Sequence, residues 1–261
     1  MRLPAGYVDY DRGTVRVIAT QLELEEMVGL LLDAQGRRRP VSPPAPGEVP
    51  AAGRGGARRI VLPGGKAVYV RNYRRGGIVR HFITDLFLKR PERPLRELVV
   101  TEAARAAGCP VPTVMAVCIE EAGLFYRGAI VTEEIDGAVP LIEEFEAADS
   151  DSRARLLARV GVAVRGLHDA GIYHVDLTGY NVLVDGAGSP VLIDFDRGFM
   201  AAAAQRRLAG RGLERFWRSM KKLCAARGVE LLAAEHAALL EGYENSAPDG
   251  LLVTSAAGKI G

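Results

Sequence analysis

The chain has 261 residues, of which 48% are hydrophobic and 25% are charged. This composition is ordinary for a soluble globular protein and excludes global disorder. The 34 Lys and Arg residues nearly balance the 32 Asp and Glu residues, and a net charge of +2 argues against bulk binding to nucleic acid. The length suffices for one large domain or two small lobes.

Basic residues are nevertheless concentrated in two stretches. Residues 71–96 contain eight Lys or Arg against two acidic residues, and residues 205–222 contain seven against one. Each stretch is either a solvated charged face or a surface for an anionic partner, such as a phosphorylated substrate or an anionic membrane.

The cysteines and the apolar segments indicate the compartment. Cys109, Cys118 and Cys224 show no CxxC spacing, which favours a reducing compartment and no zinc site. No N-terminal run resembles a signal peptide, and no apolar run approaches the roughly 20 residues that span a bilayer. We expect a cytoplasmic protein that can lie peripherally on a membrane.

The start of the chain is expected to precede the folded lobes. Residues 21–32 predict a short helix within an N-terminal extension. Residues 36–56 are rich in Pro, Gly and Arg and lack periodicity, which is typical of a linker. We therefore expect an extension with a Pro-rich linker at 1–45, a small lobe at 46–134 and a second lobe at 135–261.

The small lobe has the pattern β-β-α-β-β. Two strands at 59–62 and 67–73 flank a Pro-Gly-Gly-Lys turn, which is typical of a hairpin. A helical pattern at 95–107 is closed by glycine and then proline. Two further strands are predicted at 114–119 and 125–132.

The second lobe is mainly helical. Asp149, Ser150 or Asp151 can cap a helix whose apolar positions run to Leu167 at helical spacing. Two short strands at 182–184 and 191–193 enclose the turn Asp185-Gly186-Ala187-Gly188. Further helices are predicted at 208–226 and 229–243.

One constellation carries the chemistry. Residues 174–181 read His-Val-Asp-Leu-Thr-Gly-Tyr-Asn and match H-x-D-L-x-x-x-N, the catalytic-loop pattern of protein kinases. Asp194 follows an apolar strand and precedes Phe195, where such kinases hold a metal-binding aspartate. The joint pattern is far more specific than HxD alone. It predicts an α+β, protein-kinase-like fold with a small β-rich N-lobe that contains one key helix and a shortened, mainly helical C-lobe.

Phosphoryl transfer explains why these residue types are needed. It depends on positioning and on neutralising the charge of the phosphates. Mg²⁺ prefers oxygen ligands, so Asn181 and Asp194 are expected to hold it. Asp176 is expected to accept or orient the proton of the attacking hydroxyl. His174 is expected to brace the loop rather than to titrate in the reaction.

A kinase also needs a cation on the ATP phosphates, which is usually a lysine on a strand that pairs with a helical glutamate. Arg71 occupies the lysine position in Val-Tyr-Val-Arg, and an arginine can bridge phosphate oxygens. Glu97 is the favoured partner of Arg71, and Glu102 is the alternative.

Two further segments are expected to contact ATP. Backbone N–H groups of a glycine-rich turn can approach phosphates. The stretch where the lobes join is expected to bind adenine through its backbone. The residues concerned are Gly53, Gly55 and Gly56 for the phosphates, and Thr132, Glu133, Glu134 and Ile135 for adenine.

These residues carry a resemblance to a known family. Over residues 50–225 the chain is similar to the 3-deoxy-D-manno-octulosonic acid (Kdo) kinases, which belong with the lipopolysaccharide core kinases. The matching segments are Val70-Arg71-Asn72-Tyr73-Arg74-Arg75-Gly76-Gly77, Arg96-Glu97, Gly108-Cys109-Pro110-Val111-Pro112, residues 171–177, Ile193-Asp194-Phe195-Asp196-Arg197-Gly198 and residues 215–223.

The resemblance implies a reaction. ATP, with Mg²⁺, would phosphorylate the 4-hydroxyl of Kdo attached to lipid A at the cytoplasmic face of the inner membrane. It also implies that an arginine at 71 and an aspartate at 196 belong to an active site. Only about 65 residues follow Asp194 and no A-P-E sequence is present, which favours a small or lipid-linked acceptor over a protein. Acceptor or membrane contacts are expected from Arg74, Arg75 and Arg80.

Four alternatives remain open at this point. The acceptor could be a heptose of the lipopolysaccharide core, or the chain could be a small atypical protein kinase. A non-catalytic scaffold predicts loss of a base or a metal ligand, yet Asp176, Asn181 and Asp194 are all present. Aminoglycoside phosphotransferases also carry an HxD loop, but their acceptor sites are acid-rich, whereas the flanking faces of this chain are basic.

Overall fold

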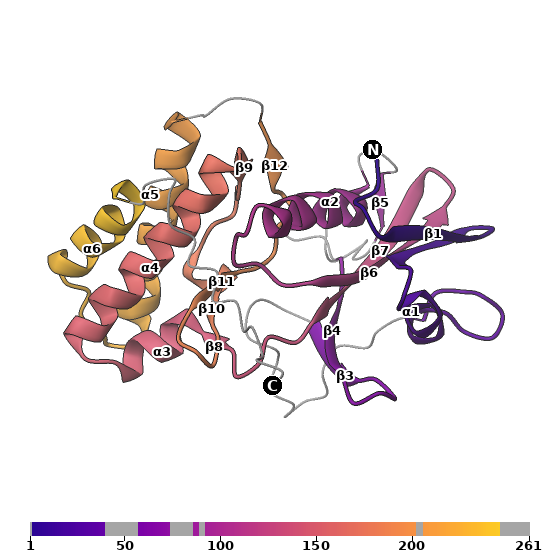
Figure 1. Ribbon diagram of the computed structural model, residues 1–261, viewed down its shortest axis with the longest axis horizontal. Helices are drawn as coiled ribbons and strands as arrows, with labels where there is room; N and C mark the ends of the chain where they lie inside the picture. Colours follow the sequence, from indigo (N-terminus) through magenta and orange to yellow (C-terminus); the bar gives the residue numbers. More distant parts are fainter. Residues whose placement is uncertain (1, 40–56, 74–85, 89–91, 202–205, 246–261) are drawn as a thin grey trace, which may run out of the picture.

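The computed structural model of the protein describes residues 2–39, 57–73, 86–88, 92–201 and 206–245. The chain forms two lobes, one built on a β-sheet from the first half of the chain and one mainly helical from the second half (Figure 1). The expected α+β, two-lobed fold is confirmed.

The first lobe is an antiparallel sheet of seven strands. Its order is β1-β2-β6-β7-β4-β3, and β5 pairs with β7. The strands are β1 (Tyr7–Arg12), β2 (Val15–Thr20), β3 (Ala57–Val61), β4 (Ala67–Asn72), β5 (Phe87–Leu88), β6 (Val114–Ala122) and β7 (Phe125–Glu133).

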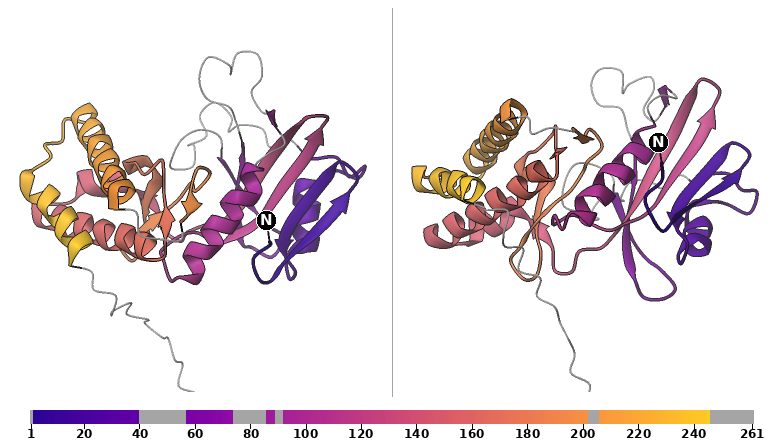
Figure 2. Two further views of the ribbon diagram at one scale, coloured as in Figure 1. Left: turned by 90° about the horizontal axis from the view of Figure 1, so that it is seen from above. Right: turned by 45° about the horizontal axis from the view of Figure 1, so that its top comes forward.

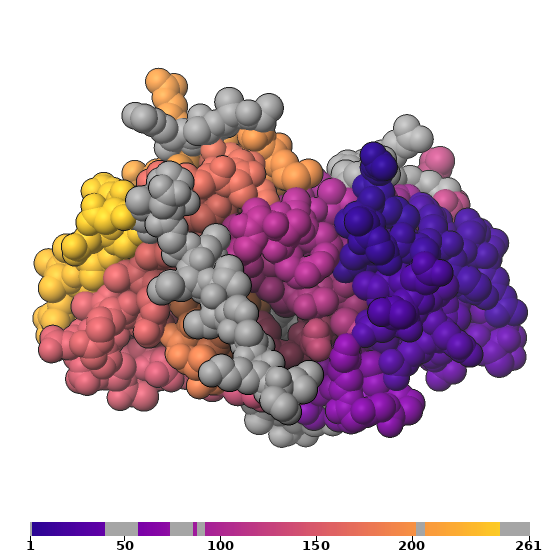
Figure 3. Space-filling view, viewed as in Figure 1, coloured from indigo at the N-terminus to yellow at the C-terminus, as the bar shows by residue number. Residues whose placement is uncertain are grey.

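One helix covers each face of this sheet. Alternate side chains of a strand point to opposite faces, so Val17 of β2 packs with α1 (Leu24–Leu31), whereas its neighbour Ile18 packs with α2 (Arg93–Ala106). The helix α2 lies on the side that faces the second lobe, and it fills the middle of the space-filling view (Figures 2 and 3). It can therefore present side chains to both lobes.

The expected N-terminal extension is instead part of the sheet. β1 and β2 form a hairpin, and β2 pairs with β6 from Val15 against Glu120 to Ala19 against Ala116. The hydroxyl of Tyr7 also donates to the carbonyl of Val114. Most residues of β2 are buried, because β2 lies between β1 and β6 in the sheet. The predicted linker at 36–56 lies largely outside the described residues.

The second lobe is organised around a long helix. It contains α3 (Leu141–Ala147), α4 (Ser150–Asp169), α5 (Arg206–Ala226) and α6 (Ala233–Glu244), with β8 (Val139–Pro140), β9 (Ile172–Tyr173), β10 (Val182–Val184), β11 (Pro190–Leu192) and β12 (Phe199–Met200). α4 begins where predicted, because the side chain of Asp149 accepts a hydrogen bond of 2.8 Å from the N–H of Ser152. None of the described helices is long and apolar enough to cross a membrane.

Two glycines allow α4 and α6 to pack at very close range. A Cβ added at Gly161 would lie 2.2 Å from the carbonyl oxygen of Leu239, and one added at Gly242 would lie 2.0 Å from that of Ala158. The obstacle in both cases is backbone, which cannot move aside as a flexible side chain can. Glycine at these positions is therefore required by helix packing.

We expect Gly161→Ala to lower the free energy of unfolding by about 1–3 kcal/mol, because the helices must separate. Gly29→Ala in α1 is the matched control, since nothing lies within 4 Å of a Cβ added there. It should raise the free energy of unfolding by about 0.5–1 kcal/mol through helix propensity. Urea denaturation measures both variants, and equal stabilisation by both would contradict this account of the packing.

Candidate active site

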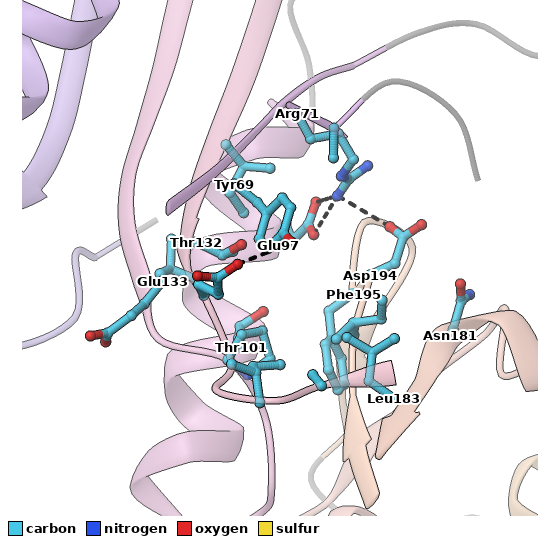
Figure 4. A pocket seen from close by; sticks show the side chains of 18 of the residues that line it. Tyr69, Arg71, Glu97, Thr101, Thr132, Glu133, Asn181, Leu183, Asp194 and Phe195 are labelled. Atoms are coloured by element: carbon cyan, nitrogen blue, oxygen red, sulfur yellow. Dashed lines mark hydrogen bonds and ion pairs between the residues drawn. The ribbon is translucent and has the colours of Figure 1, made fainter. Parts of the chain in front are cut away.

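A cavity of about 460 Å³ lies between the two lobes. Its walls include apolar side chains from both lobes, among them Val114 and Ile130 from the sheet and Leu183 from β10. Polar residues gather at one end, where Arg71, Glu97, Asn181 and Asp194 line it (Figure 4). A pocket with mostly apolar walls and a few convergent polar groups is typical of a ligand site.

The predicted partnership of Arg71 with Glu97 is present. Nη2 of Arg71, on β4, lies 2.6 and 2.9 Å from the two carboxylate oxygens of Glu97, on α2. The hydroxyl of Tyr73 also donates to Glu97, whose side chain is 5% exposed. The alternative partner, Glu102, instead binds Arg105 one turn further along α2. Arg71 therefore connects the sheet to the helix α2.

Arg71 also reaches the second lobe. Its Nη2 lies 3.2 Å from Oδ1 of Asp194 (Figure 4). Burial acts against the charge on Arg71, but the carboxylates of Glu97 and Asp194 outweigh burial and raise the pKa of the guanidinium. Arg71 is a permanent cation at the polar end of the cavity.

Asp194 has an unusual backbone. It is the one non-glycine residue among those described with a positive φ, at +66°. Its buried Oδ1 accepts no hydrogen bond within the described part of the chain, although Arg71 is near. A strained aspartate whose buried oxygen lies near a cation but accepts no hydrogen bond has the character of a cation ligand. Hard cations such as Mg²⁺ prefer this kind of oxygen donor.

Asn181 lies beside Asp194 at the same end of the cavity (Figure 4). Its Nδ2 donates a 2.9 Å hydrogen bond to the backbone carbonyl of Asp176, which orients the amide and leaves its oxygen for another partner. The carbonyl of Asn181 accepts from the N–H of Ile193 at 3.0 Å, immediately before Asp194. Asn181 precedes β10 and Asp194 follows β11, and these two strands are paired. An amide oxygen and a carboxylate thus lie at neighbouring strand ends, and this donor set fits magnesium.

His174 connects the catalytic-loop motif at 174–181 to the segment around Asp194. Its Nε2 lies 2.8 Å from the carbonyl oxygen of Ile193, and its ring packs on Phe195 with 4.7 Å between centroids. Burial lowers the pKa of His174, so the ring is neutral and Nε2 donates. The geometry therefore matches bracing of the loop, because the ring ties residue 174 to the segment that carries Asp194.

Asp176 lies between two arginines. Its Oδ2 is 3.3 Å from Nη1 of Arg197, and its Oδ1 is 3.0 Å from Nη1 of Arg215 on α5. The aspartate side chain is 37% exposed, so it remains open to solvent. A carboxylate in this position can meet a hydroxyl that arrives from outside the cavity.

In residues 132–135, which join the lobes, some backbone N–H groups already donate to carbonyl groups of the protein. The N–H of Glu133 donates to Thr113 and that of Glu134 donates to Ala67, each at 3.0 Å. The side chain of Glu134 is bound by Arg59. Among the described residues, no backbone carbonyl accepts from the N–H of Ile135, which lines the cavity and is therefore one available donor.

Several sequence-predicted residues fall outside the described chain. They are Gly53, Gly55, Gly56, Arg74, Arg75 and Arg80. Their predicted contacts with phosphate, acceptor or membrane remain predictions.

Other residues of the site were not anticipated. Arg93 binds both carboxylate oxygens of Asp196, and Arg96 donates to its carbonyl at 2.8 Å. Both arginines lie on α2, so this contact fixes the helix to the segment after Asp194. Both arginines belong to the basic stretch at 71–96, but sequence spacing does not show which carboxylate each of them binds. The same holds for Arg215, which lies 39 residues from Asp176.

Comparison with known proteins agrees with this geometry. The sequence profile of the Lipopolysaccharide kinase (Kdo/WaaP) family matches residues 50–243. A protein named 3-deoxy-D-manno-octulosonic acid kinase from Stenotrophomonas maltophilia (strain K279a) is 36% identical over 201 residues, which cover 74% of this chain and 76% of that protein. Proteins of the same name from Xanthomonas axonopodis pv. citri (strain 306) and Xylella fastidiosa (strain 9a5c) are 34% and 31% identical, each over 75% of this chain and 78% of their own length.

Among solved structures, the bifunctional kinase-methyltransferase WbdD aligns with a TM-score of 0.42 at 20% identity, over 68% of this chain and 40% of that one. The family match extends over most of the chain, including the cavity and the segments that carry Asp176, Asn181 and Asp194. The chain belongs to the Lipopolysaccharide kinase (Kdo/WaaP) family.

Proposed function

We propose that the protein is an ATP- and magnesium-dependent kinase that phosphorylates the 4-hydroxyl of Kdo on Kdo-lipid A, in synthesis of the lipopolysaccharide core. One observation carries the proposal. Asp176, Asn181 and Asp194 converge beside a nucleotide-sized cavity, in a chain whose relatives are named for Kdo phosphorylation. The acceptor is inferred from the names of the relatives, and phosphoryl transfer is inferred from the arrangement of these three residues.

Each residue would contribute a separate part of the transfer. Bound Mg²⁺ would neutralise charge on the ATP phosphates, and Asn181 and Asp194 would hold it. Asp176 would accept the proton of the sugar hydroxyl as that oxygen attacks the terminal phosphorus, whose bond to the bridging oxygen breaks to release ADP. Arg71 would bind phosphate oxygens while Glu97 fixes its position. The N–H of Ile135 would bind the adenine edge at the junction of the lobes.

The proposal is tested by transfer from γ-labelled ATP to Kdo-lipid A, to a heptose-bearing core acceptor and to a generic protein. We expect label on the Kdo sugar. Asp176→Asn should lower turnover by about 10²–10⁴-fold, because the variant loses the general base. Label on the heptose or the protein alone would retain the kinase and reject the acceptor. ATP binding without any label would favour the non-catalytic scaffold.

The role of Arg71 can be separated from its contribution to stability. Arg71→Met should raise the KM for ATP, lower kcat and destabilise the protein by roughly 3 kcal/mol, because Glu97 is left buried without its cation. Adding Glu97→Gln should restore much of the stability, since the amide is neutral and can still bind the hydroxyl of Tyr73. It should not restore ATP use.

Thermal melting and ATP kinetics on both variants make the comparison. Recovery of ATP use together with stability would show that Arg71 acts only through folding, and would contradict a phosphate-binding role. The conservative variant Arg71→Lys keeps the charge without the planar fork, and an intermediate KM for ATP is expected.

We infer that the protein also contacts an anionic membrane surface through α5. Six basic side chains on this helix are exposed, and at 100° per residue they fall within an arc of about 120°. Apart from Arg215, none forms an ion pair within the described part of the chain. The exposed Glu214 lies in the same arc, so six positive charges face one negative charge. The excess positive charges repel each other, and an anionic surface would relieve that repulsion. The six are Arg207, Arg211, Arg215, Arg218, Lys221 and Lys222.

Cosedimentation with vesicles that contain phosphatidylglycerol tests this contact. Arg211→Glu with Lys222→Glu should weaken binding by at least about 30-fold at low salt, because each surface charge contributes about 1 kcal/mol. The control, Arg155→Glu with Arg159→Glu on α4, makes the same charge change at exposed positions of another helix and should have little effect. Equal loss in both pairs would reject α5 as the contact surface.

A further inference from the structure

The two arginines at Asp176 come from different parts of the chain. Arg197 lies between β11 and β12, three residues after Asp194, whereas Arg215 lies within α5. They contact opposite oxygens of the same carboxylate, at 3.3 and 3.0 Å. Their side chains are 59% and 45% exposed, so both stand at the open mouth of the site.

The local charge does not balance. Two guanidinium groups face one carboxylate, which leaves a net charge of one positive unit where the acceptor must arrive. Within the described part of the chain, Asp176 is the carboxylate that Arg197 and Arg215 contact. Each guanidinium has five N–H donors, and each uses one nitrogen for Asp176. The remaining donors are suited to a second carboxylate, which an arginine binds through paired hydrogen bonds.

The neighbouring carboxylates are arranged differently. Asp196 receives Arg93 through both oxygens, with the arginine 25% exposed, and Asp194 faces Arg71, which is 22% exposed. Those arginines are covered by the fold and serve internal contacts. The pair at Asp176 differs because its cations are more exposed and outnumber the carboxylate.

The acceptor of the proposed reaction carries the second carboxylate that Arg197 and Arg215 can bind. Kdo is a sugar acid, and its carboxylate is attached to C2 while the reacting hydroxyl is on C4, so one ring carbon separates the two positions. When that hydroxyl approaches Asp176, the carboxylate must therefore lie within a few ångströms of the same residue. Arg197 and Arg215 occupy that neighbourhood.

We propose that Arg197 and Arg215 form a subsite for the carboxylate of the acceptor sugar, and that they select an acidic sugar over a neutral one. This inference rests on the proposed function and specifies how its acceptor is recognised. A neutral sugar leaves both cations without the second carboxylate, so it forfeits charge-assisted hydrogen bonds that the acid makes. The same contacts direct the hydroxyl toward Asp176.

The test compares two acceptors that differ at one group: Kdo-lipid A and the same molecule with the Kdo carboxylate converted to a neutral carboxamide. The wild-type protein should prefer the acid by on the order of 10²-fold in kcat/KM. Arg215→Gln and Arg197→Gln should each reduce this preference by about tenfold, mainly through the acceptor KM, and the double variant should abolish it. The KM for ATP should not change.

Two further variants complete the design. Arg215→Lys keeps the charge and should retain part of the preference, whereas Arg155→Gln on α4 should retain all of it. Thermal melting of each variant establishes that it is folded, and the exposure of both arginines makes large losses of stability unexpected.

The outcomes separate this inference from the proposed function. If the wild-type protein phosphorylates Kdo-lipid A but the variants slow the acid and the carboxamide equally, the arginines act only on Asp176 and the subsite is rejected. A raised KM for ATP with unchanged preference would assign them to phosphate binding and would also reject it. If the wild-type protein labels a different acceptor and not Kdo-lipid A, the proposed function fails, and the subsite fails with it.

Discussion

The contact between Arg71 and Glu97 is the interaction on which the rest of the site depends. It joins β4 to α2 inside the first lobe, and it extends to Asp194 in the second lobe. Its carboxylate is almost fully buried, so the pair can persist only with well-formed hydrogen bonds. Tyr73 supplies one of these bonds. A single guanidinium thus connects the sheet, the helix α2 and the segment after β11 that carries Asp194.

The site as a whole uses arginine to place its carboxylates. Asp194 faces Arg71, Asp196 is bound by Arg93, and Asp176 lies between two further guanidinium groups. Arginine remains charged when partly buried, and its planar guanidinium group fixes the orientation of the carboxylate that it binds. This arrangement gives each aspartate a defined orientation before nucleotide or acceptor arrives, which is the preorganisation that phosphoryl transfer requires.

Much of the fold and of the candidate site could be predicted from the sequence, because the residues proposed to carry the chemistry lie in short motifs with fixed spacing. The partnership of Arg71 and Glu97 follows from a strand and the next helix, and it is confirmed. The alternation of Val15 and Val17 is a strand pattern. The sequence does not show that this strand joins the sheet, because its partner β6 lies about 100 residues later. The approach of Arg215 to Asp176 depends on how α5 packs, and no local pattern encodes it.

The position of β2 has a consequence for how the protein can be divided. The family match begins at residue 50, yet β2 covers the edge of β6 with backbone hydrogen bonds along five residue pairs. A fragment cut at the family boundary would uncover a long strand whose side chains were selected for burial. Exposed strands of this kind recruit strands from other molecules, so such a fragment would tend to self-associate. The sheet of the first lobe therefore extends beyond the segment that the family profile matches, because β1 and β2 belong to it.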